Sequence, residues 1–129
     1  MKHLKLLLLL LLLLIIGACS RTNLKFELTD DQVNDIIQQQ KVDFNNILVK
    51  DWDEVYIFMP YTPKEVISEE LGVDFRYFTD IESSEIYLVV FKNNNKIINY
   101  CEFYYEWFQL DISEMTVLTS EEAVIYIKP

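Results

Sequence analysis

The first 20 residues constrain this chain more than any other segment, because they determine where the protein resides. Lys2 and Lys5 precede nine consecutive leucines and the pair Ile15 and Ile16. A basic start followed by an apolar run and small residues is typical of a secretory signal peptide. The apolar run that begins at Leu6 has 11 residues, whereas a helix needs about 20 to cross a hydrocarbon core. The segment is therefore predicted to direct export and not to span a membrane.

A cysteine follows the small residues directly, and Ile16-Gly17-Ala18-Cys19 resembles the lipobox of bacterial lipoproteins. The resemblance implies that the Cys19 sulfur receives a diacylglycerol and that the signal peptide, residues 1–18, is removed just before it. It also implies a location at the cell membrane or outer membrane, on the non-cytoplasmic side. The alternatives are an ordinary cleaved signal with a coincidental Cys19, or a truncated anchor.

Charge limits the partners of the remaining chain. Without residues 1–18, 111 residues are left, the size of one modest domain. They hold nine basic and 21 acidic side chains, a formal charge of −12. Because nucleic acids and anionic headgroups call for basic patches, binding to nucleic acid is not expected. The predicted link to the membrane is through the acyl chains on Cys19.

Missing residue types exclude several kinds of chemistry from the mature chain. Its only histidine, His3, leaves with the signal, so Ser-His-Asp and Cys-His catalysis and histidine-based metal sites are excluded. Gly72 is the single remaining glycine, which excludes glycine-rich phosphate loops. Cys101, inside an apolar and aromatic run, is expected to be a buried, inert thiol. No cofactor, no metal and no catalytic residue is predicted.

Two helices are indicated by their end signals. Thr29 and Gln32 have the spacing of a capping box, which predicts a helix over about 30–40. In the second helix, Thr62 is the expected cap and Pro63 the first helical residue. Gly72 is the expected stop, because glycine readily takes the left-handed conformation that ends helices.

The remaining pattern predicts strands, and the strand over 85–91, like that over 54–59, has apolar residues on both faces, which suggests that the sheet is covered on both sides. Asparagines 93–95 are expected to form a hairpin turn after it. The other predicted strands are 54–59, 96–103, 115–118 and 123–128. These elements predict a single small α+β domain over residues 29–129, preceded by a short tether over 19–28. Its antiparallel sheet is expected to have about four to five strands, with two helices on one face.

Aromatic residues suggest a binding surface. All 18 lie after the signal, and they are densest over residues 100–108. On a strand, alternate side chains point to opposite faces, so some of these rings are expected outward, where they suit sugar rings or a protein partner. The candidates for partner binding are Tyr100, Tyr104, Tyr105 and Trp107. The alternative is that these rings fill the core of a small domain.

Asp51-Trp52-Asp53-Glu54 is the densest acidic run. Its carboxylates suit a hard cation such as calcium, although the spacing does not match an EF-hand, and a solvated loop explains the run equally well. Residues 51–62 are also similar to a run in small uncharacterised bacterial proteins, in which Trp-Asp, a strand and Pro-Tyr lead into a helix. That resemblance implies no activity.

The sequence thus predicts a membrane-tethered, acidic binding or interaction module of the cell envelope, with an envelope protein or glycan as its partner. Two alternatives stay open. One is a hydrolase that uses two facing carboxyl groups on cell-wall glycan. The other is a tethered binder of cations or small solutes. An enzyme is the less favoured class, because no pair of the 21 acidic residues is singled out by its spacing.

Overall fold

The computed structural model describes residues 2–19, 24–75 and 81–129 and forms an α+β domain with two antiparallel sheets, which confirms the predicted fold class. The helices are α1 (Lys2–Cys19), α2 (Asp30–Gln39), α3 (Phe44–Ile47) and α4 (Lys64–Leu71), and the strands are β1 (Lys41–Asp43), β2 (Glu54–Phe58), β3 (Ile86–Asn93), β4 (Lys96–Tyr104), β5 (Thr116–Thr119) and β6 (Val124–Tyr126). The larger sheet has the order β4-β3-β2-β5, and β1 pairs with β6 in the smaller one. The β1 strand and the single-turn helix α3 were not predicted.

The β3–β4 hairpin is tighter than expected. Asn93 pairs with Lys96, so the turn has two residues, Asn94 and Asn95, and not three. Both have positive φ, 50° and 63°. Two consecutive residues of this kind make the mirror-image turn whose twist matches that of the paired strands. Asparagine tolerates this conformation, which explains why the turn needs no glycine.

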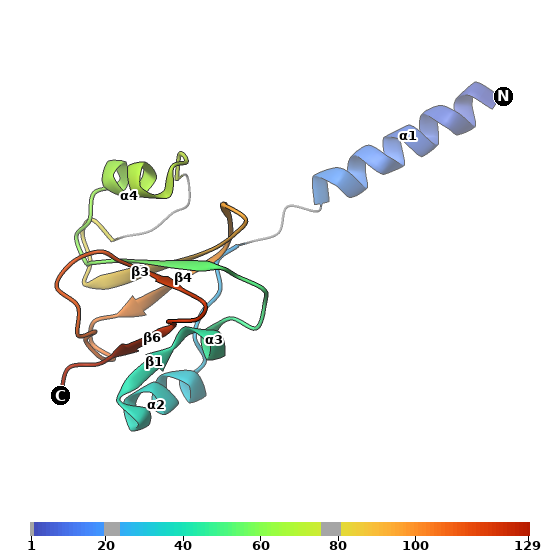
Figure 1. Ribbon diagram of the computed structural model, residues 1–129. Helices are drawn as coiled ribbons and strands as arrows, with labels where there is room; N and C mark the ends of the chain where they lie inside the picture. The colour runs from blue at the N-terminus through green and yellow to red at the C-terminus, as the bar shows by residue number, and fades with distance from the viewer. Residues whose placement is uncertain (1, 20–23, 76–80) are drawn as a thin grey trace.

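The central strand β3 is buried on both faces, as predicted, because its alternate side chains enter two hydrophobic cores. One face carries Tyr87, Val89 and Phe91, and the other carries Ile86, Leu88 and Val90. A strand of this kind requires a covering layer on each side of the sheet. Figure 1 shows these layers: α2, α3 and the β1–β6 sheet lie below the larger sheet, and α4 lies above it.

The layer below the sheet begins with α2, whose predicted capping box is present. The Thr29 hydroxyl accepts a hydrogen bond from the Gln32 backbone N–H at 3.2 Å, and the Gln32 side chain accepts one from the Thr29 N–H at 3.0 Å. Val33 and Ile36 are buried against the core formed with β1, α3 and β6. Local sequence signals and the tertiary structure therefore agree for α2.

The two predicted helices do not share a face of the sheet, which corrects the expectation that both lie on one side. Ile67 and Leu71 of α4 pack with Phe58 in the second core, whereas α2 contributes only to the first. The physical reason lies in β3: each of its faces is apolar, and one layer of helices would leave the other face in water.

The start of α4 also differs from expectation. Pro63 is the N-cap residue, and Thr62 makes no cap, because its hydroxyl donates to the Met59 carbonyl at 2.6 Å. The Lys64 N–H donates instead to the Glu82 carboxylate at 2.6 Å, so a side chain distant in sequence satisfies the first turn.

The end of α4 is as predicted. Gly72 has φ 71° and its N–H donates to the Glu69 carbonyl. The buried Lys92 extends from β3 and donates to the Leu71 carbonyl at 2.5 Å, and its ammonium lies 4.9 Å from the centroid of the Tyr56 ring. A cation at a helix C-terminus interacts favourably with the helix dipole, so Lys92 fastens α4 to the sheet.

Gly72→Ala is expected to lower the free energy of unfolding by about 1 kcal/mol, because alanine is strained at positive φ. A Cβ atom at Gly72 would meet nothing within 4 Å, so the loss reflects backbone conformation alone. Chemical denaturation of this variant beside Lys64→Ala, an exposed change in the same helix, measures the difference. Equal midpoints and slopes would contradict the prediction.

The described part of the expected tether belongs to the folded domain. Residues 24–28 run parallel to the outer edge of β4, where the Tyr100 N–H donates to the Leu24 carbonyl and the Phe26 N–H donates to the Tyr100 carbonyl, both at 3.0 Å. Leu28 is buried, and Phe26 packs on the first core. The boundary expected at residue 29 therefore lies five residues too late, since 24–28 cover an edge that β4 would otherwise expose. Residues 20–23 lie outside the described residues.

The apolar N-terminal run forms helix α1, which projects away from the domain (Figure 1). Within the part of the chain that the structure describes, no helix is both long enough and apolar enough to cross a membrane. Cys19 is the last residue of α1.

Candidate functional site

The four aromatic residues predicted to bind a partner do not form one surface, because Tyr100 is buried. Only 4% of its area is exposed, and its ring packs edge-on against Phe75, with centroids 5.8 Å apart. Tyr100 pairs with Val90 and faces the core beneath α4. The expectation that Tyr100 contributes to a binding surface is therefore wrong, and the alternative that this ring fills the core is correct.

Tyr104 and Trp107 form a partly exposed aromatic pair at the end of β4. The chain turns there, and the Trp107 N–H donates to the Tyr104 carbonyl at 3.0 Å. This turn brings the rings together edge-on, with centroids 4.6 Å apart and planes at 87°. Tyr104 is 40% exposed, and Trp107 is half-buried against the first core. Because packing and the ring contact hold both side chains in place, they present a rigid surface to a partner.

Tyr105 extends this surface toward the preceding loop. Its N–H donates to the Glu85 carbonyl at 2.9 Å, and its half-buried ring stacks on Tyr87, with centroids 6.1 Å apart. The Tyr87 hydroxyl in turn accepts a hydrogen bond from the Leu110 N–H at 3.2 Å. Tyr105 is thus held by the core and keeps one side toward solvent.

Tyr61, which the sequence did not single out, joins the same region. It is 54% exposed and has φ 67°, a conformation that a bulky side chain rarely adopts. Its N–H donates to the Ile81 carbonyl at 2.7 Å, which holds the backbone in place. Partial desolvation and the nearby Glu85 carboxylate raise the pKa of the Tyr61 hydroxyl. Backbone strain of this kind concentrates at functional sites.

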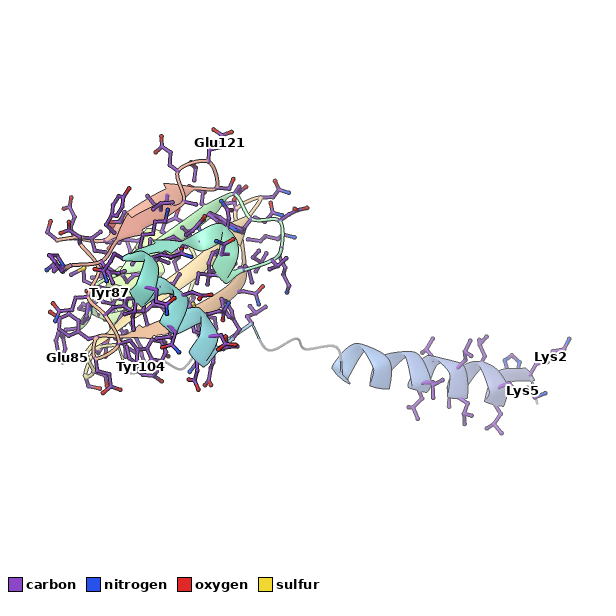
Figure 2. All side chains as sticks on the ribbon, turned by 90° about the horizontal axis from the view of Figure 1, so that it is seen from below. Lys2, Lys5, Glu85, Tyr87, Tyr104 and Glu121 are labelled. Carbon is purple, nitrogen blue, oxygen red and sulfur yellow. The ribbon has the colours of Figure 1, made fainter. Side chains whose placement is uncertain are left out.

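Two cavities join these residues into one surface. A cavity of about 310 Å³ is lined by Ser84, Glu85, Ile86, Glu102, Tyr104 and Glu106. A second, of about 230 Å³, is lined by Met59, Pro60, Tyr61, Glu85 and Tyr105. Glu85 lines both. We refer to six residues together as the acidic–aromatic surface: Tyr61, Glu85, Tyr104, Tyr105, Glu106 and Trp107. Figure 2 labels Glu85 and Tyr104, which lie together on the side of the domain away from α1.

Glu102, at the edge of this surface, is partly neutralised by Lys25. Their charged atoms lie 3.3 Å apart. Desolvation acts to lower the pKa of Lys25, but the Glu102 carboxylate outweighs it and the pKa is raised. Lys25, Glu102, Tyr104 and Trp107 line a further cavity of about 210 Å³ beside α2. The N-terminal segment therefore forms one wall of this part of the site.

The other residues singled out by the sequence have structural roles. Cys101 is buried in the first core, and burial raises the pKa of its thiol well above the usual value, as expected for an inert cysteine. Trp52 packs edge-on against Phe91, with centroids 5.3 Å apart. The Asp53 carboxylate accepts a hydrogen bond from the Asn94 N–H at 3.0 Å and so fastens the hairpin turn.

Among residues 2–19, 24–75 and 81–129, no three or more histidine, cysteine, aspartate or glutamate side chains are grouped so as to hold a metal ion. The role of Asp53 in the hairpin turn accounts for part of the acidic run 51–54.

Sequence reasoning missed Tyr61, Glu85 and Glu106 because they meet only in the folded chain. Tyr61 follows β2, Glu85 precedes β3 and Glu106 follows β4. Antiparallel pairing brings the end of β2, the start of β3 and the end of β4 to one end of the sheet. A prediction of the strand order would have placed these three residues at the same end of the sheet.

Comparison of this chain with protein-family models, with curated proteins and with solved structures finds no match.

Proposed function

We propose that this protein is an envelope lipoprotein, anchored through acyl chains on Cys19, whose domain binds an envelope protein through the acidic–aromatic surface. The observation that carries the proposal is the rigid Tyr104–Trp107 pair, which is held by its own turn and flanked by cavities lined with carboxylates. Exposed, immobilised aromatic rings provide contact area at little cost in conformational entropy, and such rings dominate the affinity of protein interfaces.

The chemistry of the surface favours a partner segment that carries lysine or arginine. Glu85 and Glu106 line the cavity of about 310 Å³ together with Tyr104, and no lysine or arginine of the described residues lines it. An ammonium or guanidinium group is attracted both by carboxylates and by the faces of aromatic rings. The formal charge of −12 on the chain after the signal adds long-range attraction for a basic partner.

The test is recovery of partners after crosslinking in intact envelopes. Tyr104→Ala is expected to weaken recovery by about 2 kcal/mol in affinity, the usual effect of losing an anchor ring. Tyr61→Gly is expected to weaken recovery too, while its relief of positive φ leaves the stability of the domain unchanged or raised. Tyr126→Ala is the matched control, because that tyrosine is 64% exposed on β6.

Folded Tyr104→Ala and Tyr61→Gly proteins that recover every partner as well as wild type does would exclude the surface from binding. Recovery of glycan instead of protein, equally sensitive to Tyr104→Ala, would replace the proposed partner class and keep the surface.

A second candidate is the carboxylate-based hydrolase, since Glu85, Glu102 and Glu106 line one cavity. The ion pair with Lys25 occupies Glu102, which leaves Glu85 and Glu106 as the acid and base that such a mechanism requires. Release of reducing sugar from purified cell wall by the wild-type protein, absent in Glu85→Gln, would favour this function over binding alone.

A further inference from the structure

We infer that the hairpin end of the domain faces the bilayer that holds Cys19, and that the acidic–aromatic surface faces away from it. We define the hairpin end as the β3–β4 turn together with the loop between α3 and β2. This inference rests on the proposed anchoring through Cys19. It implies that the binding partner approaches from the aqueous side of the envelope and is not reached laterally within the same membrane.

Hydrogen bonds fix the hairpin end next to the point where the N-terminal segment joins the domain. The Leu24 backbone carbonyl accepts a hydrogen bond from the Asn99 side-chain amide at 3.1 Å, and the Asn99 side-chain oxygen Oδ1 accepts one from the Lys50 ammonium at 3.1 Å. Asp53, farther along the same loop, is bonded to the turn residue Asn94. Figure 1 shows this loop, the hairpin turn and the N-terminal segment on the same side of the domain.

The direction of the N-terminal segment decides which end points to the membrane. Lys25 bridges to Tyr100 in parallel orientation, so residues 24–28, followed back toward Leu24, run toward the start of β4 and the hairpin turn. Leu24 is therefore level with Asn99, and the three residue steps from Asn99 to Lys96 correspond to about 10 Å along a strand. The five steps from Leu24 back to Cys19 span at most about 18 Å when fully extended. The N-terminal segment therefore reaches at most about 8 Å beyond Lys96.

A reversal of the chain before Leu24 is the only way to invert the domain. A tight turn needs four residues, which is the number between Cys19 and Leu24. No length would remain to clear the far end of β4, where Tyr104 lies another 13 Å or so beyond Tyr100. Connection length thus favours contact of the hairpin end with the headgroups.

The hairpin end offers an apolar and a basic side chain to the headgroups. The loop between α3 and β2 presents Val49, whose side chain is 92% exposed, and the turn is followed by the exposed Lys96. The opposite end carries the cavity that holds Glu85 and Glu106. The same loop also carries Asp51 and Asp53, so carboxylates lie at both ends of the domain, and the connection length decides the orientation.

The experiment places one fluorophore at each end of the full-length lipidated protein. Val49→Cys labels the hairpin end, and Glu106→Cys labels the acidic–aromatic surface; both positions are exposed, so the fold tolerates the changes. The natural Cys101 is fully buried and is expected to stay unlabelled in the folded protein. Treatment of the unsubstituted protein with the same fluorophore is the control for this expectation. Each labelled protein is reconstituted into phosphatidylcholine vesicles that contain phosphatidylcholine spin-labelled near the headgroup.

Quenching by the spin label is expected to be several-fold stronger at position 49 than at position 106. Equal quenching at both positions, as for a domain lying on its side, or stronger quenching at position 106 would overturn the inference while leaving the anchoring intact. Flotation of the vesicles separates the two proposals: if the wild-type protein does not float with them, the anchoring fails and the orientation fails with it.

Discussion

Tyr100→Ala is expected to lower the free energy of unfolding by about 3–5 kcal/mol, the range for removal of a large buried aromatic ring. The ring lies beneath α4 and contacts Phe75, and 4% of its area is exposed. Its loss leaves a cavity between the sheet and α4, which the rigid central strand β3 cannot fill. Chemical denaturation of the domain measures the change.

Tyr104→Ala is the matched control, because Tyr104 lies on the same strand and is 40% exposed. Its stability is expected to change by less than about 1 kcal/mol, since exposed side chains contribute little. The difference in the free energy of unfolding between the two variants shows which of the two tyrosines on this strand belongs to the core and which to the surface. A Tyr100→Ala protein as stable as Tyr104→Ala would show that the ring does not support α4.

Cys19→Ala is expected to abolish incorporation of a fatty-acid analogue, because only the cysteine sulfur can accept the diacylglycerol that the lipobox resemblance implies. The protein should then accumulate uncleaved or be released from the membrane. Each buried methylene contributes about 0.8 kcal/mol to membrane binding, so loss of the acyl chains removes the whole anchor. Metabolic labelling followed by membrane fractionation measures both effects.

Cys101→Ala is the control for this labelling, since Cys101 is the second cysteine of the chain and is buried in the first core. It should retain full incorporation of the analogue. Equal incorporation into wild type and Cys19→Ala would exclude Cys19 as the attachment site and, with it, the proposed location.

Local signals predicted the elements that depend on neighbouring residues. Thr29 and Gln32 form the capping box of α2, and Gly72 ends α4 at positive φ, because these interactions lie within one or two turns of the chain. The burial of both faces of β3 was also readable, since an uninterrupted apolar run has no polar face to place in water.

Interactions with residues distant in the sequence could not be predicted from the sequence. The first turn of α4 is satisfied by Glu82 and not by the adjacent Thr62. Residues 24–28 were predicted to be part of a tether, although Leu24, Phe26 and Leu28 alternate with polar residues as in a strand, and they pair with β4. In both cases the hydrogen-bond partner is brought close only by the fold.

The aromatic run over 100–108 shows what the sequence determines by itself and what only the tertiary structure decides. Its sequence by itself determined that Tyr100 and Tyr104 point to the same side of β4, because side chains alternate along a strand. Only the tertiary structure decided that one ring is core and the other surface: α4 and Phe75 cover Tyr100, and Tyr104 lies at the end of the strand, where a turn pairs it with Trp107. Burial depends on what packs against a residue, and that is set by contacts between segments far apart in the chain.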